Sequence, residues 1–268
     1  MAIQGLGYNP AILQFQAKRG GESMAFLLPF LNSDMAVLDV GCGPGHVTAA
    51  FCPHVRDVIG LDVESRAIAA ASAMRDAGGH SNLQFVEGDM VAMPFDDETF
   101  DVVFFHAVLY HQNTVVLEST LEEAWRVLKP GGLIATRDTD AGGNILYPET
   151  EGLRLSLNLW QRWYEHSSGD AVTFGRRQGA ILRSHGFEPI WAGGSYVNHS
   201  ADASARAETV VDAKRSLHGL AGDLIAKNLA SRLEIDTAVS AWETWGMESD
   251  SVYLRCRCEC IAARPRGR

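Results

Sequence analysis

The segment Val37-Leu38-Asp39-Val40-Gly41-Cys42-Gly43-Pro44-Gly45 decides the fold of this chain. Its first four residues are mostly apolar, as in a buried strand, and glycines follow at three alternate positions. Glycine has no Cβ, so it allows a tight backbone turn and the close approach of a ligand. The segment therefore predicts a strand that turns into a helix, with a ligand-binding loop at the turn.

Two kinds of ligand use such a loop. A dinucleotide-binding turn needs Gly-x-Gly-x-x-Gly, whose last glycine lets the helix pack close to the pyrophosphate. That pattern fails here, because the sixth position is His46. The carboxylate of Asp39 would repel a pyrophosphate, but it could accept a hydrogen bond from an ammonium group. We therefore expect a ligand with a cationic amine; the alternative is a structural turn that binds nothing.

Short apolar runs alternate with amphipathic stretches over the first 130-odd residues. Nearly continuous apolar runs are typical of parallel strands that are covered on both faces. The expected strands are 36–41, 57–63, 83–88, 100–107 and 132–138, and the expected helices are 45–53, 64–77 and 114–128. Strands and helices in this alternation predict a right-handed, doubly wound α/β sheet.

The pattern changes after residue 140. Residues 140–149 (DAGGNILYPE) have the composition of a loop, and helical periodicity follows. The expected later elements are helices over 150–166, 176–185 and 202–248 and strands over 187–197 and 251–263. The prediction is a Rossmann-like, doubly wound, seven-stranded sheet, mostly parallel with an antiparallel last strand, and with an added helical lid.

Acidic residues follow the ends of the first three strands. Asp62 comes 17 residues after Gly45, where a carboxylate suits two ribose hydroxyls. Gly88-Asp89-Met90 offers an acceptor for an exocyclic amine and an apolar side chain beside a flat ring. Each acid alone could be a solvated loop residue or a helix cap. Because the carboxyl ends of parallel strands meet at one edge of a sheet, we expect the three acids to belong to one site.

Composition narrows the possible partners. Asp and Glu total 33 against 23 Lys and Arg, which gives a net charge of −10. An acidic surface repels phosphate backbones, so nucleic acid is not expected as a partner. No apolar run approaches the roughly 20 residues needed to span a bilayer. The N-terminal sequence lacks the pattern of a secretory signal, so a cytoplasmic location without membrane insertion is expected.

Five cysteines are an odd number for a disulfide framework. Cys256, Cys258 and Cys260 raise the alternative of a zinc site. Alternate residues of a strand share one face at intervals of about 6.6 Å, whereas zinc-binding cysteines usually come from a turn. We expect a half-buried strand instead, in which the cysteines act as small apolar residues.

The ordered motifs VLDVGCGPG, GLD, GDM, FDVVFFHAVLYH and RVLKPGG resemble those of class I S-adenosylmethionine-dependent methyltransferases. The branch they resemble is the ubiquinone/menaquinone-biosynthesis-like (type 11) small-molecule branch. The motifs cover roughly residues 37–138, and flanking features extend the resemblance over nearly the whole chain. It implies methylation of a small organic molecule on oxygen, carbon or nitrogen. The alternative is a relative that binds the cofactor but catalyses another reaction, such as a cyclisation.

The resemblance also implies which residues bind S-adenosylmethionine and its product S-adenosylhomocysteine. First-strand residues would hold the methionine moiety, second-strand residues the ribose and adenine, third-strand residues the adenine, and His106 would lie near the sulfonium. Arg19 would meet the cofactor carboxylate, with surface solvation as the alternative. The implied set is Arg19, Asp39, Gly41, Cys42, Gly43, Asp62, Val63, Gly88, Asp89, Met90 and His106.

Methyl transfer from a sulfonium is an in-line displacement, so a general base is needed only when the acceptor is protonated. The candidates are His111, His106 and Asp138. A structural hydrogen bond is the alternative role for His111, and an ion pair with Arg137 is the alternative for Asp138. No ligand triad for a metal is recognisable, so a metal-independent enzyme is expected, acting on a small-molecule acceptor and possibly homodimeric.

The expected organisation has three parts. Residues 1–35 would form an N-terminal helical lid segment, 36–140 the cofactor-binding core, and 141–268 the rest of the sheet with an inserted, acceptor-binding helical cap. The glycine pairs 142–143 and 193–194 could serve as hinges of a moving lid or only as turns. Tryptophans in the cap indicate an apolar acceptor pocket or, alternatively, a helical core.

Overall fold

The computed structural model describes residues 16–17, 20–167, 170 and 172–267. The chain divides into two compact units. Unit 1 contains residues 1–138, 176–193 and 258–268, and unit 2 contains 139–175 and 194–257. The boundary between residues 193 and 194 falls within the glycine pair that was predicted as a hinge.

An eight-stranded sheet has the order β3-β2-β1-β4-β5-β8-β6, and β7 also pairs with β8. The strands are β1 Ala36–Val40, β2 Asp57–Asp62, β3 Leu83–Glu87, β4 Phe100–His106, β5 Leu128–Thr139, β6 Ile145–Tyr147, β7 Glu188–Asn198 and β8 Val252–Ala263. The Rossmann-like fold is confirmed. The additional strand is β6, whose three residues lie in the segment predicted as a loop and are too few to show a periodicity.

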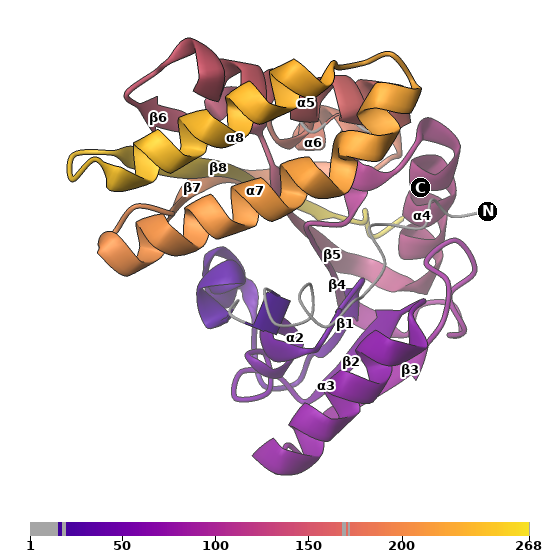
Figure 1. Ribbon diagram of the computed structural model, residues 1–268. Helices are drawn as coiled ribbons and strands as arrows, with labels where there is room; N and C mark the ends of the chain where they lie inside the picture. Colours follow the sequence, from indigo (N-terminus) through magenta and orange to yellow (C-terminus); the bar gives the residue numbers. More distant parts are fainter. Residues whose placement is uncertain (1–15, 18–19, 168–169, 171, 268) are drawn as a thin grey trace. The chain divides into compact units, whose positions relative to one another are not determined.

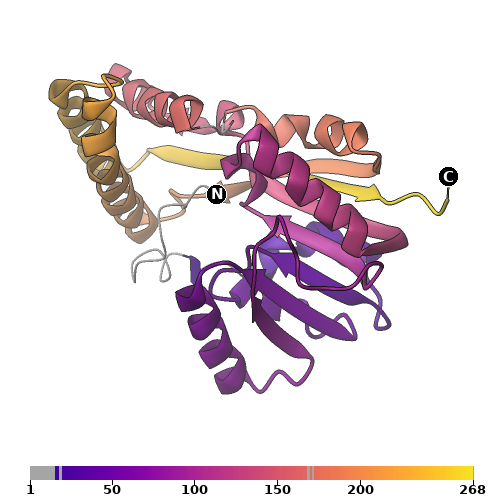
Figure 2. The same ribbon diagram turned by 90° about the vertical axis from the view of Figure 1, so that its right-hand side faces the viewer.

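Strands β1 to β5 form the parallel part of the sheet, with β1 at its centre between β2 and β4. The chain returns between strands through α2 His46–Ala49, α3 Ser65–Gly78 and α4 Thr114–Val127. Figures 1 and 2 show α3 beside β2 and β3, and α4 near β5. Parallel connection brings the carboxyl ends of these strands to one edge, which is where the predicted site residues lie.

The last strand is antiparallel, as predicted. Gly131 N donates to Arg264 O, and Arg264 N donates back to Gly132 O, both at 2.8 Å. Further along the two strands, Asp140 N donates to Cys256 O. Rising residue numbers on β5 therefore meet falling numbers on β8. The short strand β6 is also antiparallel to β8.

The cysteine-rich stretch is part of β8, which confirms the prediction of a strand. All five cysteines of the chain are free thiols. Cys260 is buried, and Cys256 and Cys258 are half-buried. Helix α6 (Phe174–Ser184) packs on this strand, since Gln178 Nε2 donates to Cys258 O at 2.9 Å.

The core of unit 1 is apolar and partly aromatic. Phe51 and Phe104 are fully buried and meet edge to face at 5.2 Å between ring centroids. The N-terminal part contributes two 3-10 helices, η1 Gly21–Ser23 and η2 Ala25–Phe30. Leu27 of η2 is fully buried in the same cluster. The described part of the predicted lid segment therefore supplies core residues.

Three helices form the body of unit 2: α5 Glu151–Ser167, α7 Ala203–Ala226 and α8 Arg232–Met247. They contact one another, and Figure 1 shows α7 running beside α8. The range 202–248, predicted to be almost wholly helical, contains α7 and α8, and a capping box of Ser231 and Glu234 starts α8. None of the helices in the described part of the chain is both long and apolar enough to cross a membrane.

Tryptophans of unit 2 build its core. Trp242 and Trp245 are buried, and their rings meet at 5.3 Å. Trp242 Nε1 donates to Ser156 Oγ at 2.8 Å, so α8 is tied to α5. These contacts give the two tryptophans a structural role, which was the alternative to an acceptor pocket.

The predicted hinge glycines are closely packed. A Cβ on Gly143 would lie 2.8 Å from Cys256 Sγ, and one on Gly194 would lie 3.2 Å from Arg257 O. Close approach of neighbouring chain segments is by itself a sufficient reason for glycine at both positions. A hinge function, and with it the moving lid, stays a prediction.

Candidate functional site

The loop after β1 has a backbone that requires glycine. Gly41, Gly43 and Gly45 have φ values of +75°, +54° and +82°, which L side chains rarely adopt. A Cβ on Gly41 would lie 2.4 Å from Val108 Cγ2. Gly41 N donates to Leu61 O at 2.7 Å, so the loop is held against the end of β2. The result is a tightly turned loop at the carboxyl edge of the sheet, in which Gly43 and Gly45 are buried.

Asp62 links this loop to the second strand. Its Oδ2 accepts from Gly43 N at 2.9 Å, and its Oδ1 accepts from Glu64 N at 3.0 Å. A carboxylate oxygen has two lone pairs, so an oxygen that accepts one backbone N–H can also accept a hydroxyl. Val63 follows directly and is 55% exposed. The binding of a ribose and an adenine by these two neighbours stays a prediction.

Asp39 is buried beneath the loop. Its Oδ2 accepts from Thr48 Oγ1 at 2.6 Å, which ties β1 to α2. Burial, opposed by the Thr48 hydrogen bond and reinforced by the charge of Asp62, raises the pKa of Asp39 to about 7. A nearby cation would therefore favour the ionised carboxylate. The predicted direct contact of Asp39 with an ammonium group stays a prediction.

The third strand joins the same site. Gly88 N donates to the backbone oxygen of Asp62 at 3.0 Å, so the end of β3 is fixed to the end of β2. Asp89 Oδ1 accepts from Val91 N at 3.1 Å and shapes the turn that follows. Asp89 and Met90 are half-buried. Hydrogen bonds thus link the loop after β1 to the end of β2 and the end of β2 to the end of β3. The buried loop residue Cys42 takes part, since its N donates to Leu61 O at 3.1 Å.

At the end of β4, His106 is also buried, and its Nε2 lies 3.0 Å from Arg137 Nη1. A guanidinium only donates, so a hydrogen bond between these two atoms requires Nε2 to be the acceptor. Arg137 Nε in turn donates to Glu259 Oε1 at 3.0 Å in a buried ion pair. The sequence interpretation missed Glu259 because the pairing of β5 with β8 is not recognisable from local pattern.

The other two predicted catalytic residues, His111 and Asp138, have different environments. His111 is half-buried in η3 (Leu109–His111), with its ring 3.8 Å from that of Tyr110. Asp138 is fully buried in β5. Successive strand residues point to opposite faces, so Asp138 lies on the face opposite Arg137, whose ion-pair partner here is Glu259. The prediction for Arg19 lies outside the described residues. Over the described ranges, no group of three His, Cys, Asp or Glu side chains could hold a metal.

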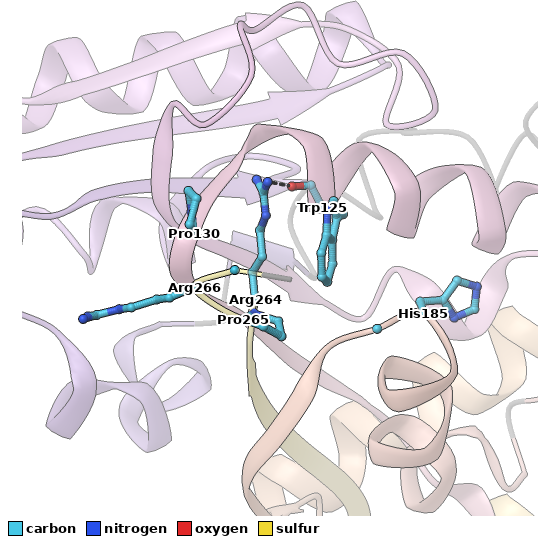
Figure 3. Close-up of a pocket in the computed structure, with 8 residues that line it drawn as sticks. Trp125, Pro130, His185, Arg264, Pro265 and Arg266 are labelled. Carbon is cyan, nitrogen blue, oxygen red and sulfur yellow. Dashed lines mark hydrogen bonds between the residues drawn. The ribbon is translucent and has the colours of Figure 1, made fainter.

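A pocket of about 360 Å³ lies elsewhere in unit 1. Figure 3 shows Trp125, Pro130 and His185 among its lining residues, with Arg264 beside the Trp125 ring at 5.2 Å. Arg264 Nη1 donates to Trp125 O at 3.0 Å. Pro130 is near the start of β5, whereas the predicted site residues follow the carboxyl ends of the strands. This pocket is therefore separate from the candidate site.

Residues 37–132 match the family model described as a methyltransferase domain. The chain is 37% identical over 170 residues to the probable methyltransferase LtbC of Aspergillus luteorubrus, covering 60% of this chain and 57% of LtbC. It is 28% identical to an uncharacterised methyltransferase of Schizosaccharomyces pombe over 92% of this chain and 91% of that protein. A solved structure from Bacillus halodurans, assigned to the methyltransferases, superposes with a TM-score of 0.61 at 25% identity, covering 91% of this chain and 100% of that chain.

The doubly wound sheet, the glycine loop and the acids at the strand ends agree with these matches. Residues 37–132 are a methyltransferase domain, and the chain resembles class I S-adenosylmethionine-dependent methyltransferases in its fold and motifs. A phosphoethanolamine N-methyltransferase of Haemonchus contortus, solved in complex with S-adenosyl-L-methionine, shares the fold at 17% identity and a TM-score of 0.54, covering 91% of this chain and 52% of that chain. The chain spans 57% of the length of LtbC, little more than half of that protein.

Proposed function

We propose that this protein transfers the methyl group of S-adenosylmethionine to a small organic acceptor, on oxygen, carbon or nitrogen, without a metal. The observation that carries the proposal is the joined arrangement of the glycine loop, Asp62 and Val63. Asp62 presents a carboxylate that is held by two backbone N–H groups, and Val63 presents exposed apolar surface next to it. A ligand with a ribose and an adenine matches both neighbours.

The chain's own residues would bind and orient the reactants. When bound, the cofactor supplies an activated sulfonium methyl. The tightly turned loop at Gly41 and Gly43 would accommodate the methionine moiety, with the buried charge of Asp39 favouring its ammonium group. Holding donor and acceptor in line can supply roughly 7–11 kcal/mol of the barrier at best. Positioning is therefore the main catalytic contribution that we assign to this site.

A general base would act only on an acceptor that is protonated at the operating pH. His106 accepts from Arg137 at Nε2, so that ring nitrogen is engaged in a structural contact. Asp138 is fully buried on the opposite face of β5. His111 is half-buried in the loop after β4, and we propose it as the base where one is needed.

A small acceptor is supported by the net charge of −10, which disfavours nucleic acid. Sterol 24-C-methyltransferases are among the relatives, and the acceptor named for those proteins is a small apolar molecule. We propose an acceptor of this general size. A cytoplasmic location and a homodimeric state stay predictions of the sequence.

Incubation with S-adenosylmethionine and pooled small metabolites tests the proposal. Release of S-adenosylhomocysteine together with a product heavier by one methylene supports methyl transfer. The Asp62→Ala variant should lose this release, and Asp57→Ala, at the exposed start of the same strand, should keep it. Consumption of a substrate without S-adenosylhomocysteine would instead support the alternative of a reaction such as cyclisation.

A further inference from the structure

Three side chains form a row across neighbouring strands of unit 1. His106 of β4 is in parallel register with Arg137 of β5. The hydrogen bonds between Gly132 and Arg264 set an antiparallel register in which Glu259 of β8 lies opposite Arg137. Partners in register point to the same face of a sheet. The row therefore follows from the topology and ends at the carboxyl end of β4.

The contacts along the row are direct. Glu259 Oε1 accepts from Arg137 Nε, and Arg137 Nη1 donates to His106 Nε2, each at 3.0 Å. All three side chains are less than 10% exposed. Arg137 also accepts, through its backbone oxygen, from Ala107 N at 2.9 Å. The strand end that carries His106 is thus held to β5 by both side chain and backbone.

The geometry limits the protonation of His106. In the tautomer with a proton on Nε2, two N–H donors would face each other at 3.0 Å. In the imidazolium form, two positive charges would stand at that distance in a buried place. Only the neutral ring with its proton on Nδ1 forms a hydrogen bond with Arg137. Glu259 balances the guanidinium charge and fixes its orientation.

We propose that Arg137 and Glu259 are positioning residues that hold His106 as a neutral imidazole protonated at Nδ1. His106 would then present a hydrogen-bond donor, rather than a base, at the carboxyl end of β4. The proposal rests on the proposed function for its catalytic meaning, since that strand end belongs to the methyl-transfer site. A purely structural ion pair is the competing explanation.

The tautomer can be measured directly in the protein without ligand. Long-range ¹H–¹⁵N spectra of histidine-labelled protein at pH 7.5 distinguish the two neutral tautomers from the imidazolium, and His106→Gln assigns the His106 signals among nine histidines. We expect a protonated Nδ1 and an unprotonated Nε2. In Arg137→Met, the Nε2-protonated tautomer should become measurably populated. Arg215→Met removes an exposed arginine from a pair with Asp212 and should change nothing.

Removing one partner of a buried ion pair leaves an uncompensated charge, so Arg137→Met could fail to fold. The double variant Arg137→Met/Glu259→Gln removes both charges and provides a second test. An Nε2-protonated or charged His106 in the wild type would overturn the proposal. So would an unchanged His106 signature in a double variant that melts normally. The NMR spectra and the melts use neither cofactor nor acceptor. The absence of methyl transfer would contradict the proposed function only, whereas the wrong protonation state of His106 would contradict this proposal only.

Discussion

Gly43 donates its backbone N–H to Oδ2 of Asp62 at 2.9 Å, across 19 positions of sequence. The glycine loop after β1 and the carboxylate at the end of β2 are therefore one structural unit. Substitution of Asp62 should thus affect the loop as well as any ribose contact.

Asp62→Ala should weaken the binding of S-adenosylhomocysteine at least tenfold. Hydrogen bonds to a charged group contribute about 1.5–3 kcal/mol, and about 1.4 kcal/mol corresponds to a factor of ten. Isothermal titration calorimetry measures the change, with Asp57→Ala as the control. The melting temperature should fall modestly, because Gly43 and Glu64 lose their acceptor. Unchanged affinity with a normal melt would contradict the ribose assignment.

Gly41→Ala should both destabilise the protein and abolish cofactor binding. Alanine at position 41 would have to adopt a φ near +75°, which L residues rarely do, and its Cβ would lie 2.4 Å from Val108 Cγ2. Gly219 is the matched control, because it lies in α7 and a Cβ there meets nothing within 4 Å. Gly219→Ala should raise stability by up to about 1 kcal/mol, since alanine favours helix more than glycine does. Chemical denaturation measures the free energy of unfolding of both variants. A change in the same direction from wild type in both would contradict the prediction.

Local pattern was sufficient to predict the parallel part of the sheet. Each strand there is a short apolar run, and the loop at Gly41, the acid Asp62 and the turn at Asp89 follow the strands directly. These residues converge because parallel strands end at a common edge. The same argument explains why the cofactor residues that the resemblance implies lie together at that edge, and their role in binding stays a prediction.

Contacts between distant segments could not be predicted. Glu259 is 122 residues from Arg137, and only the antiparallel register of β8 brings them together. Local pattern placed Arg137 beside Asp138 as a possible pair, but neighbours in a strand point to opposite faces. The region 202–248 was predicted as helical without a boundary between helices, and the structure places that boundary at the cap of Ser231.

A strong chelator should leave methyl transfer unchanged, and purified protein should contain less than one equivalent of zinc. The physical reason is the geometry of β8, where Cys256, Cys258 and Cys260 are spread along a strand rather than gathered by a turn. Elemental analysis by mass spectrometry provides the measurement. Stoichiometric zinc that disappears in a Cys258→Ser variant would show that the cysteines bind metal.

His199 should make the protein less stable as the pH falls below about 6.5. Burial and the charges of Arg255 and Arg257 lower the pKa of His199 from 6.5 to about 3. Between these values the unfolded chain binds a proton that the folded chain does not, so stability decreases as the pH decreases. His199→Gln should reduce this loss between pH 7 and pH 4.5, whereas the exposed His218→Gln should not. Equal acid sensitivity of the two variants would count against the assignment.

Asp39 should make the protein less stable as the pH rises, because burial raises its pKa from 3.8 to about 7. Between pH 4 and pH 7 the folded chain holds a proton that the unfolded chain has released, so stability falls as the pH rises and levels off above pH 7.

Asp39→Asn cannot ionise, and its amide oxygen can still accept from Thr48. The variant should match the wild type near pH 4 and exceed it at pH 8 by a few kcal/mol, since one pKa unit corresponds to about 1.4 kcal/mol. It should also bind S-adenosylmethionine more weakly, because the buried negative charge is lost. Calorimetric melts at both pH values decide the point: a difference that does not change with pH would show that Asp39 is ionised throughout.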